Sequence, residues 1–307
     1  MESALLERLF LHASTHLPRP SIPAFLYGCA WKKDKTSRLV CEALSAGFTG
    51  IDVAAQPKHY DEPGAGDGIR RAITQGKIAR KDLFIQTKYT PISGQDLSNV
   101  PYDSAASISS QVHASIASSL YNLRVDDDPQ SDCNYLDSLI LHSPLPTMAQ
   151  TKEAWQACEE HVPHKVRNLG ISNTTLTILE ELYASARIKP SVVQNRFYRN
   201  TQYEVELRRF CRQKGIVFQS FWTLSANPHL LRIPPVVFLS KETNTEPAIA
   251  LYCLVLGLKG TIILNGTQSH IQSDLESLDR VRNWAKENEY EWADTQKLFN
   301  DMIGESP

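Results

Sequence analysis

The segment GIDVAAQPKHYDEPGAGDGIRRAITQGKIARKDLFIQTK, residues 50–88, contains two short apolar runs with a longer segment between them. The runs GIDVA (residues 50–54) and LFIQTK (residues 83–88) are rich in β-branched and aromatic residues, which favours strands. In residues 64–75 the apolar side chains recur at helical spacing. The segment therefore predicts a strand, a helix and a second strand parallel to the first.

This strand-then-helix unit recurs along the whole chain. The predicted strands are residues 25–28, 50–54, 83–88, 135–142, 166–173, 191–197, 217–221 and 261–266, and the clearest helices are residues 36–46, 64–75, 174–186, 202–214 and 271–288. Eight units is the number in a (β/α)8 barrel, and a doubly wound sheet would usually show GxGxxG after its first strand. We therefore predict an α/β fold, a single (β/α)8 TIM barrel over residues 1–307, with residues 1–22 as an N-terminal extension.

Two stretches interrupt the pattern. Residues 89–104 (YTPISGQDLSNVPYDS) form a predicted long loop on the strand-to-helix side, where barrel active sites are built. Residues 124–134 (RVDDDPQSDCN) form a polar insertion on the opposite side, for which we expect no function.

Composition narrows the class of protein. The chain has 32 Lys+Arg and 34 Asp+Glu, which gives a net charge of −2. This charge does not favour binding to nucleic acid or to an acidic membrane. The sequence contains no 18-residue apolar run, and its first residues, MESALLERLF, do not resemble a signal peptide. Six scattered cysteines without CxxC spacing are typical of reduced thiols. We expect a cytoplasmic enzyme without a metal, because no cluster of metal-ligating residues follows the strands.

Charged and polar residues end several of the apolar runs. Asp52, Lys88 and His142 end the second, third and fourth predicted strands, and Ser172 and Asn173 end the fifth. Strand ends of a barrel converge on one mouth, so we expect these side chains to be neighbours.

Six segments resemble, in order, the aldo-keto reductase family over residues 25–290. They are GIDVAAQPKHYDEPGAGDGIRRAI, LFIQTKYTP, YLDSLILHSP, VRNLGISN, VVQNRFY and GIVFQSFWTL. The variants GCAWKK and QPKHY are most similar to a fungal-type subgroup. The resemblance implies an NADP-dependent oxidoreductase that reduces a small-molecule aldehyde or ketone, and we expect a monomer.

The resemblance implies a catalytic tetrad of Asp52, Tyr60, Lys88 and His142. The spacing from Asp52 to Tyr60 is longer than the family pattern, so His59 remains an alternative to Tyr60 as the acid. A tyrosine can supply the proton that a reduced carbonyl needs if a nearby ammonium lowers its pKa. Lys88 has this expected role, with Asp52 as its partner and His142 as the donor that orients the carbonyl.

The resemblance also implies a nicotinamide nucleotide. Ser172, Asn173 and Gln194 match residues that bind the carboxamide, although Ser172 and Asn173 can alternatively cap a helix. Phe221 stands where an aromatic ring stacks on the nicotinamide. For the phosphates the expected residues are Asn265, Gly266, Thr267 and His270, which replace the fixed cations of NADPH-selective members. We therefore expect NADPH with weak discrimination against NADH, and His270 or Lys259 as the remaining cation.

The expected substrate pocket is lined by Trp31, Tyr89, Ser143 and Trp222. Two other functions remain open for the same fold. One is a redox-sensing regulatory subunit that binds nucleotide without turnover. The other is a lyase in which Lys88 forms a Schiff base.

Overall fold

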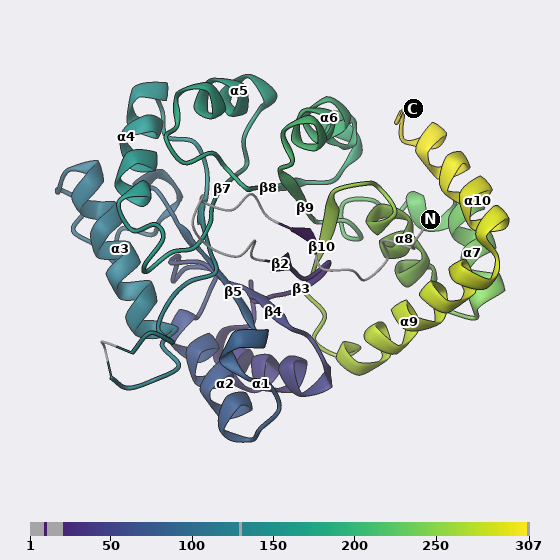
Figure 1. The fold of residues 1–307 in the computed structure, drawn as a ribbon, viewed down its shortest axis with the longest axis horizontal. Helices are drawn as coiled ribbons and strands as arrows, with labels where there is room; N and C mark the ends of the chain where they lie inside the picture. The colour runs from purple at the N-terminus through teal and green to yellow at the C-terminus, as the bar shows by residue number, and fades with distance from the viewer. Residues whose placement is uncertain (1–8, 11–20, 129–130, 306–307) are drawn as a thin grey trace.

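Eight parallel strands of the chain close into a barrel, which confirms the predicted fold class (Figure 1). The computed structural model describes residues 9–10, 21–128 and 131–305. The strands follow the order β10-β3-β4-β5-β6-β7-β8-β9 around the barrel. They are β3 Phe25–Gly28, β4 Gly50–Asp52, β5 Phe84–Tyr89, β6 Ser138–Leu141, β7 Leu169–Ser172, β8 Val192–Arg196, β9 Val217–Phe221 and β10 Thr261–Asn265.

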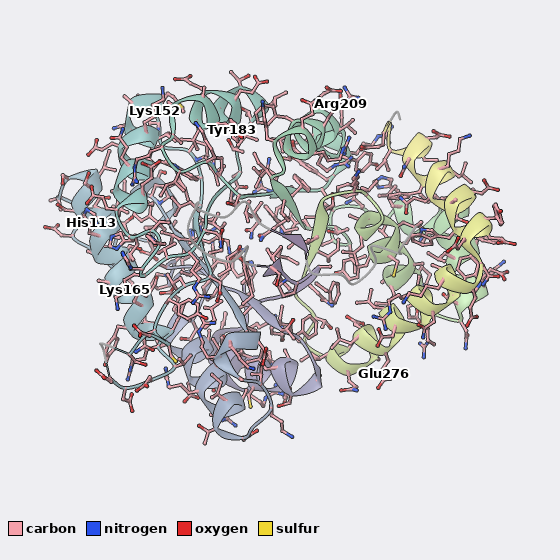
Figure 2. All side chains as sticks on the ribbon, in the orientation of Figure 1. His113, Lys152, Lys165, Tyr183, Arg209 and Glu276 are labelled. Carbon is pink, nitrogen blue, oxygen red and sulfur yellow. The ribbon has the colours of Figure 1, made fainter. Side chains whose placement is uncertain are left out.

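Helices surround the strands as an outer layer (Figure 1). They are α1 Thr36–Ala46, α2 Glu62–Thr74, α3 Ile108–Asn122, α4 Met148–Glu159, α5 Leu176–Ser185, α6 Val205–Lys214, α7 Pro234–Thr243, α8 Pro247–Leu256, α9 Ile271–Glu287 and α10 Glu289–Met302. Figure 2 shows Lys152, Arg209 and Glu276 pointing outward from this layer. The apolar core therefore lies between the strands and the inner faces of the helices, as a barrel requires.

Local signals decide where two of the helices begin. The Asp61 side chain accepts a hydrogen bond from the Gly64 N–H, and Pro63 occupies the first turn, so α2 begins two residues before the predicted helix. The helix predicted at residues 202–214 begins only at Val205, because residues 202–204 have left-handed φ values of 51° to 58°.

The long loop after β5 lies on the strand-to-helix side and is fastened to the barrel. It contains a single 3-10 turn, Ile92–Gly94, and the buried Tyr102 hydroxyl donates to the Thr90 carbonyl over 2.7 Å. The polar insertion lies on the opposite side, before β6, where the Asn134 amide donates to the carbonyls of Asp126 and Asp128.

Part of the predicted N-terminal extension is tied to the domain. Two short strands, β1 Leu9–Phe10 and β2 Ser21–Ile22, pair antiparallel. Ile22 is completely buried and belongs to the core, so the domain begins before residue 23. Residues 1–8 and 11–20 of the extension lie outside the described residues. No helix in the described part of the chain is both long enough and apolar enough to cross a membrane.

All six cysteines are free thiols, and five of them are buried. Burial raises the pKa of Cys29, Cys158 and Cys211 to about 12, so these thiols carry almost no thiolate at pH 8. Cys133, in the polar insertion, is exposed.

We predict that Ellman's reagent at pH 8 reacts quickly with one thiol of the native protein, Cys133, and with six after denaturation. The physical reason is that both access and thiolate formation are blocked at the buried positions. Cys133→Ser should abolish the fast phase. Two or more fast thiols in the native protein, or fewer than six in urea, would contradict this arrangement.

Candidate active site

A buried ion pair lies inside the barrel near the carboxyl ends of β4 and β5. Lys88 Nζ is 2.8 Å from Asp52 Oδ1 and 2.7 Å from Asp52 Oδ2, and it also donates to the Val53 carbonyl over 2.8 Å. Both side chains are almost fully buried. The strand register places them together, because Asp52 ends β4 and pairs with Gln86, two residues before Lys88 on β5.

Two glutamine amides donate to Asp52, and a third glutamine holds these two in place. Gln86 Nε2 and Gln194 Nε2 donate to Asp52 Oδ1 over 2.7 and 3.0 Å, and both also donate to Gln219 Oε1 over 2.8 Å. Gln219 Nε2 returns a bond of 2.9 Å to Gln86 Oε1. These donors stabilise the ionised carboxylate in a place that water does not reach.

The pair fixes Lys88 as a cation. Burial alone would lower the pKa of Lys88, but the Asp52 carboxylate outweighs this effect and raises that pKa. An ammonium that donates to three oxygens has no lone pair for attack on a carbonyl. The charge state of Lys88 therefore argues against the Schiff-base alternative.

Tyr60 lies above this pair. Lys88 Nζ is 5.1 Å from the centroid of the Tyr60 ring, and the His142 ring centroid is 6.1 Å from it, edge-on. Burial raises the pKa of Tyr60, and the Lys88 charge opposes that rise without reversing it. The Tyr60 hydroxyl therefore keeps its proton at neutral pH.

His59, the alternative acid, points elsewhere. Its ring packs against Trp31 with centroids 3.9 Å apart, and the Trp31 N–H donates to the His59 carbonyl over 2.8 Å. The ring that lies beside the Lys88 ammonium is that of Tyr60.

His142 follows β6 and is neutral. Burial, with the Lys88 charge as a second cause, lowers its pKa to about 3. Its Nδ1 lies 2.6 Å from the Thr90 hydroxyl, which orients the ring. A neutral, oriented imidazole can donate a hydrogen bond to a carbonyl oxygen without competing for the proton.

Ser172 and Asn173 lie beside His142. Asn173 Nδ2 donates to the His142 carbonyl over 2.9 Å, and Ser172 Oγ donates to the Gln194 carbonyl over 2.6 Å. Asn173 Oδ1 is buried and has no partner among the described residues. Helix α5 is capped by Thr175, so the helix-capping interpretation of Ser172 and Asn173 is wrong. The orphaned Asn173 oxygen fits the amide N–H of a nicotinamide carboxamide.

Most of the hydrogen-bonding groups of the turn after β10 have partners within the protein. Asn265 Oδ1 accepts from the Thr267 N–H, Asn265 Nδ2 donates to Asp274 Oδ2 over 2.8 Å, and the His270 N–H donates to Thr267 Oγ1. The Thr267 N–H and one Asn265 amide proton, two donors that the sequence suggests for phosphate, are thus already used. A Cβ added at Gly266 would have no atom within 4 Å, so a ligand can approach the backbone there.

Lys32 is a cation at this turn that sequence reasoning missed. It is only 2% exposed, donates to the Gly266 carbonyl over 3.0 Å and lies 4.6 Å from the Tyr27 ring centroid, yet it has no ion pair within the described residues. Lys259, in contrast, is exposed and precedes β10, at the opposite end of the strand. The expectation that Lys259 can bind phosphate is therefore wrong.

The predicted pocket residues divide into two groups. Trp31 (61% exposed) and Trp222 (52% exposed) follow β3 and β9 at the mouth, and Ser143 adjoins His142. The prediction that Tyr89 lines the pocket is wrong. Lys88 points into the barrel, so its neighbour Tyr89 points outward, where it is 1% exposed and packs against Tyr102 and Gln111.

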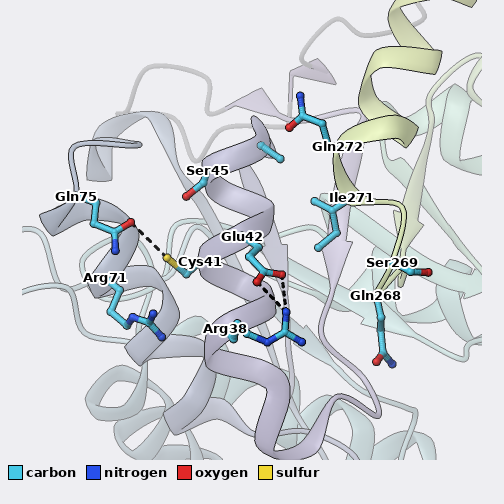
Figure 3. Close-up of a pocket in the computed structure, with 11 residues that line it drawn as sticks. Arg38, Cys41, Glu42, Ser45, Arg71, Gln75, Gln268, Ser269, Ile271 and Gln272 are labelled. Carbon is cyan, nitrogen blue, oxygen red and sulfur yellow. Dashed lines mark hydrogen bonds and ion pairs between the residues drawn. The ribbon is translucent and has the colours of Figure 1, made fainter.

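A hollow of about 540 Å³ lies outside the barrel mouth, between α1, α2 and residues 268–272 (Figure 3). Its Arg38 is neutralised by Glu42 at 2.7 Å, and none of its lining residues belongs to the tetrad. Within the described residues no group of three or more His, Cys, Asp or Glu side chains could hold a metal ion.

Comparisons with known proteins identify the family of the chain. The model of the Aldo/keto reductase family matches residues 28–294. A Bacillus subtilis oxidoreductase, YtbE, itself uncharacterized, is 32% identical over 67% of this chain and 64% of its own length, so the match spans less than two thirds of that relative. Glyoxal reductase of Bacillus subtilis is 30% identical over 81% of this chain and 78% of its own.

A solved structure shares the fold. The Bombyx mori aldo-keto reductase in complex with NADP superimposes with a TM-score of 0.66, at 20% identity, over 89% of this chain and 87% of that one.

We predict that Asp52→Leu destabilises the protein by about 3–5 kcal/mol, because it leaves a buried ammonium unpaired. The double variant Asp52→Leu/Lys88→Met should lose less than the sum of the two single variants. Urea denaturation of the four proteins measures this coupling. Arg38→Met, which breaks the exposed pair with Glu42, is the control and should cost less than about 1 kcal/mol. Strict additivity at the buried pair would show that Asp52 and Lys88 do not stabilise each other.

Proposed function

Because the chain belongs to the aldo/keto reductase family, we propose that it is a monomeric NAD(P)H-dependent reductase with Tyr60 as the general acid. Its substrate is the aldehyde or ketone group of a small molecule, and the glyoxal reductase among its relatives supports an aldehyde. The single observation that carries the proposal is the position of the Lys88 ammonium, which Asp52 holds 5.1 Å from the ring centroid of Tyr60.

When bound, the nicotinamide nucleotide supplies the hydride. The residues of the chain do the rest. We assign the Thr90 hydroxyl as the donor to His142 Nδ1, which leaves the ring proton on Nε2, facing away from Thr90. From there His142 orients the carbonyl oxygen. Tyr60 donates its proton to that oxygen, and Lys88 stabilises the phenolate that remains.

The nucleotide would be held by residues from β3 and from β7 to β10. Ser172, Asn173 and Gln194 would bind the carboxamide, which the orphaned Asn173 Oδ1 supports, and Phe221 would stack on the ring. The phosphates would be held by the open backbone of Gly266, by Lys32 as the buried cation and by His270 at the N-terminus of α9.

A regulatory subunit that binds nucleotide without turnover is the second candidate. The complete tetrad argues against it, since a protein that only binds has no need of a buried cation aimed at a tyrosine ring. Turnover with any simple aldehyde separates the two functions.

We predict that Tyr60→Phe lowers kcat roughly 10²- to 10⁴-fold, the usual effect of losing a general acid, while nucleotide binding is retained. Steady-state kinetics with glyoxal and a nucleotide fluorescence titration measure the two properties.

His59→Ala is the matched control, because His59 is the adjacent residue and packs on Trp31. It should keep turnover within a few-fold of the native enzyme. The opposite result, full activity in Tyr60→Phe and loss in His59→Ala, would make His59 the acid.

We predict that NADPH binds less than about 10-fold more tightly than NADH at pH 8. Residues 265–270 contain no Lys or Arg that could bind a 2′-phosphate, and Lys32 is expected to bind the phosphates that both nucleotides share. The preference should rise as the pH falls to 6 if a histidine contacts the 2′-phosphate, because histidine is in general the side chain whose charge changes between pH 5 and 8. Dissociation constants for both nucleotides across the range test this.

Two variants locate the cations. His270→Ala should remove the pH dependence without changing NADH binding, whereas Lys32→Met should weaken both nucleotides. Lys259→Met, at the far end of β10, should change neither. A strong NADPH preference that stays flat with pH would exclude His270 as the contact.

A further inference from the structure

Arg196 ends β8 at the mouth of the barrel and has no role in the chemistry described above. It lies two residues beyond Gln194, so both side chains point to the same face of the strand. Gln194 reaches Asp52 inside the barrel, which identifies that face as the interior one. Arg196 therefore stands one layer above the ion pair, roughly 7 Å nearer the mouth along the strand.

The guanidinium of Arg196 is held by aromatic rings. Its central carbon lies 4.6 Å from the ring centroid of Trp222 and 5.5 Å from that of Phe221. Phe221 is directly opposite Arg196 in the strand register, and Trp222 is fixed in a left-handed conformation with φ of 58°. Stacking orders a guanidinium by its face and leaves its N–H edges available for a planar anion.

Those edges are not used within the protein. In the part of the chain that the structure describes, the Arg196 side chain makes no ion pair and donates no hydrogen bond, and its Nε is buried without a partner. A buried donor that has lost its water without gaining an acceptor is costly, and such groups normally have a partner. A fixed cation of this kind fits a carboxylate, which accepts two parallel hydrogen bonds.

A hollow adjoins Arg196 and is shaped by strained backbone. It has a volume of about 320 Å³ and is lined by residues 173–176 and by parts of residues 195–207, among them Asn173, Asn195 and Thr201. Glu204 also lines it, and its carboxyl accepts from Asn195 rather than from Arg196. Burial raises the pKa of Glu204, which weakens its competition for the guanidinium.

The position of Arg196 indicates which molecule brings the anion. The expected phosphate contacts, Gly266 and Lys32, lie in the turns after β10 and β3, whereas Arg196 is on β8 beside the ring expected to stack on nicotinamide. An anion at Arg196 is thus at the reacting end of the site. Resting on the proposed function, we propose that Arg196 binds a carboxylate of the substrate, so that the enzyme prefers aldehydes or ketones that carry a second, acidic end.

The test compares two aldehydes of nearly equal shape, 4-carboxybenzaldehyde and its neutral methyl ester, at saturating NADPH. The native enzyme should favour the carboxylate in kcat/KM. Arg196→Met should lower kcat/KM for the carboxylate roughly 10- to 100-fold and leave that of the ester unchanged. Arg196→Lys should recover part of the loss, since lysine keeps the charge but not the two-pronged geometry.

Arg199→Met is the matched control, because it removes an equal charge from an exposed position three residues away that does not line the hollow. It should leave both aldehydes unchanged. Equal losses on both aldehydes in Arg196→Met, or an equal loss in Arg199→Met, would overturn the proposal. Weakened NADPH binding in Arg196→Met would assign the residue to a nucleotide phosphate instead, which also overturns it.

A binding measurement keeps this test separate from the proposed function. Because Trp222 lies under the guanidinium, its fluorescence should report the binding of 4-(hydroxymethyl)benzoate to the native protein and to Arg196→Lys, but not to Arg196→Met. Binding without reduction of either aldehyde would refute the reductase and support the carboxylate site. Reduction of both aldehydes with no dependence on Arg196 would do the reverse.

Discussion

The ion pair between Asp52 and Lys88 is the constraint around which the mouth of the barrel is organised. An ammonium that is completely buried needs a carboxylate, and a buried carboxylate needs further donors, which Gln86 and Gln194 provide. Gln219 then holds the two amides in one orientation. Four strands, β4, β5, β8 and β9, thus contribute to one polar cluster. The distance between Lys88 and the Tyr60 ring is fixed because this cluster holds the ammonium in place.

Backbone strain marks the same end of the barrel independently of any relative. Of the described non-glycine residues with positive φ, all but Asn244 follow the carboxyl end of a barrel strand: Trp31, Lys33, Asn173, Gln202, Tyr203, Glu204 and Trp222. Each such conformation costs on the order of 1–3 kcal/mol and persists only where the surroundings enforce it. Its concentration around the tetrad indicates that this backbone is shaped for binding, while the opposite end of the barrel is free to be regular.

The order of the elements and the residues at the strand ends were predictable from sequence, because each depends on local periodicity or on the convergence of barrel strands. Contacts across the barrel were not. Gln86 and Gln219 are separated by 133 positions, and a glutamine within a strand gives no sign that it is completely buried. The prediction that Tyr89 lines the pocket was wrong. It was avoidable, because side chains alternate along a strand and Lys88 points into the barrel, so Tyr89 must point outward. The prediction for Lys259 was wrong because Lys259 is close in sequence to the turn after β10 but precedes the strand, and so lies at its opposite end.

The charge state of Tyr60 differs from the simplest expectation for such a site, and the difference has a direction. A nearby ammonium lowers the pKa of a phenol, but here burial outweighs Lys88, so the net pKa is raised. Tyr60, the proposed proton donor, is therefore protonated at neutral pH. Burial also makes the phenol a weaker acid, so the Lys88 ammonium, which stabilises the phenolate, opposes this effect and helps the proton to leave. The neutral His142 beside Tyr60 does not compete for the proton.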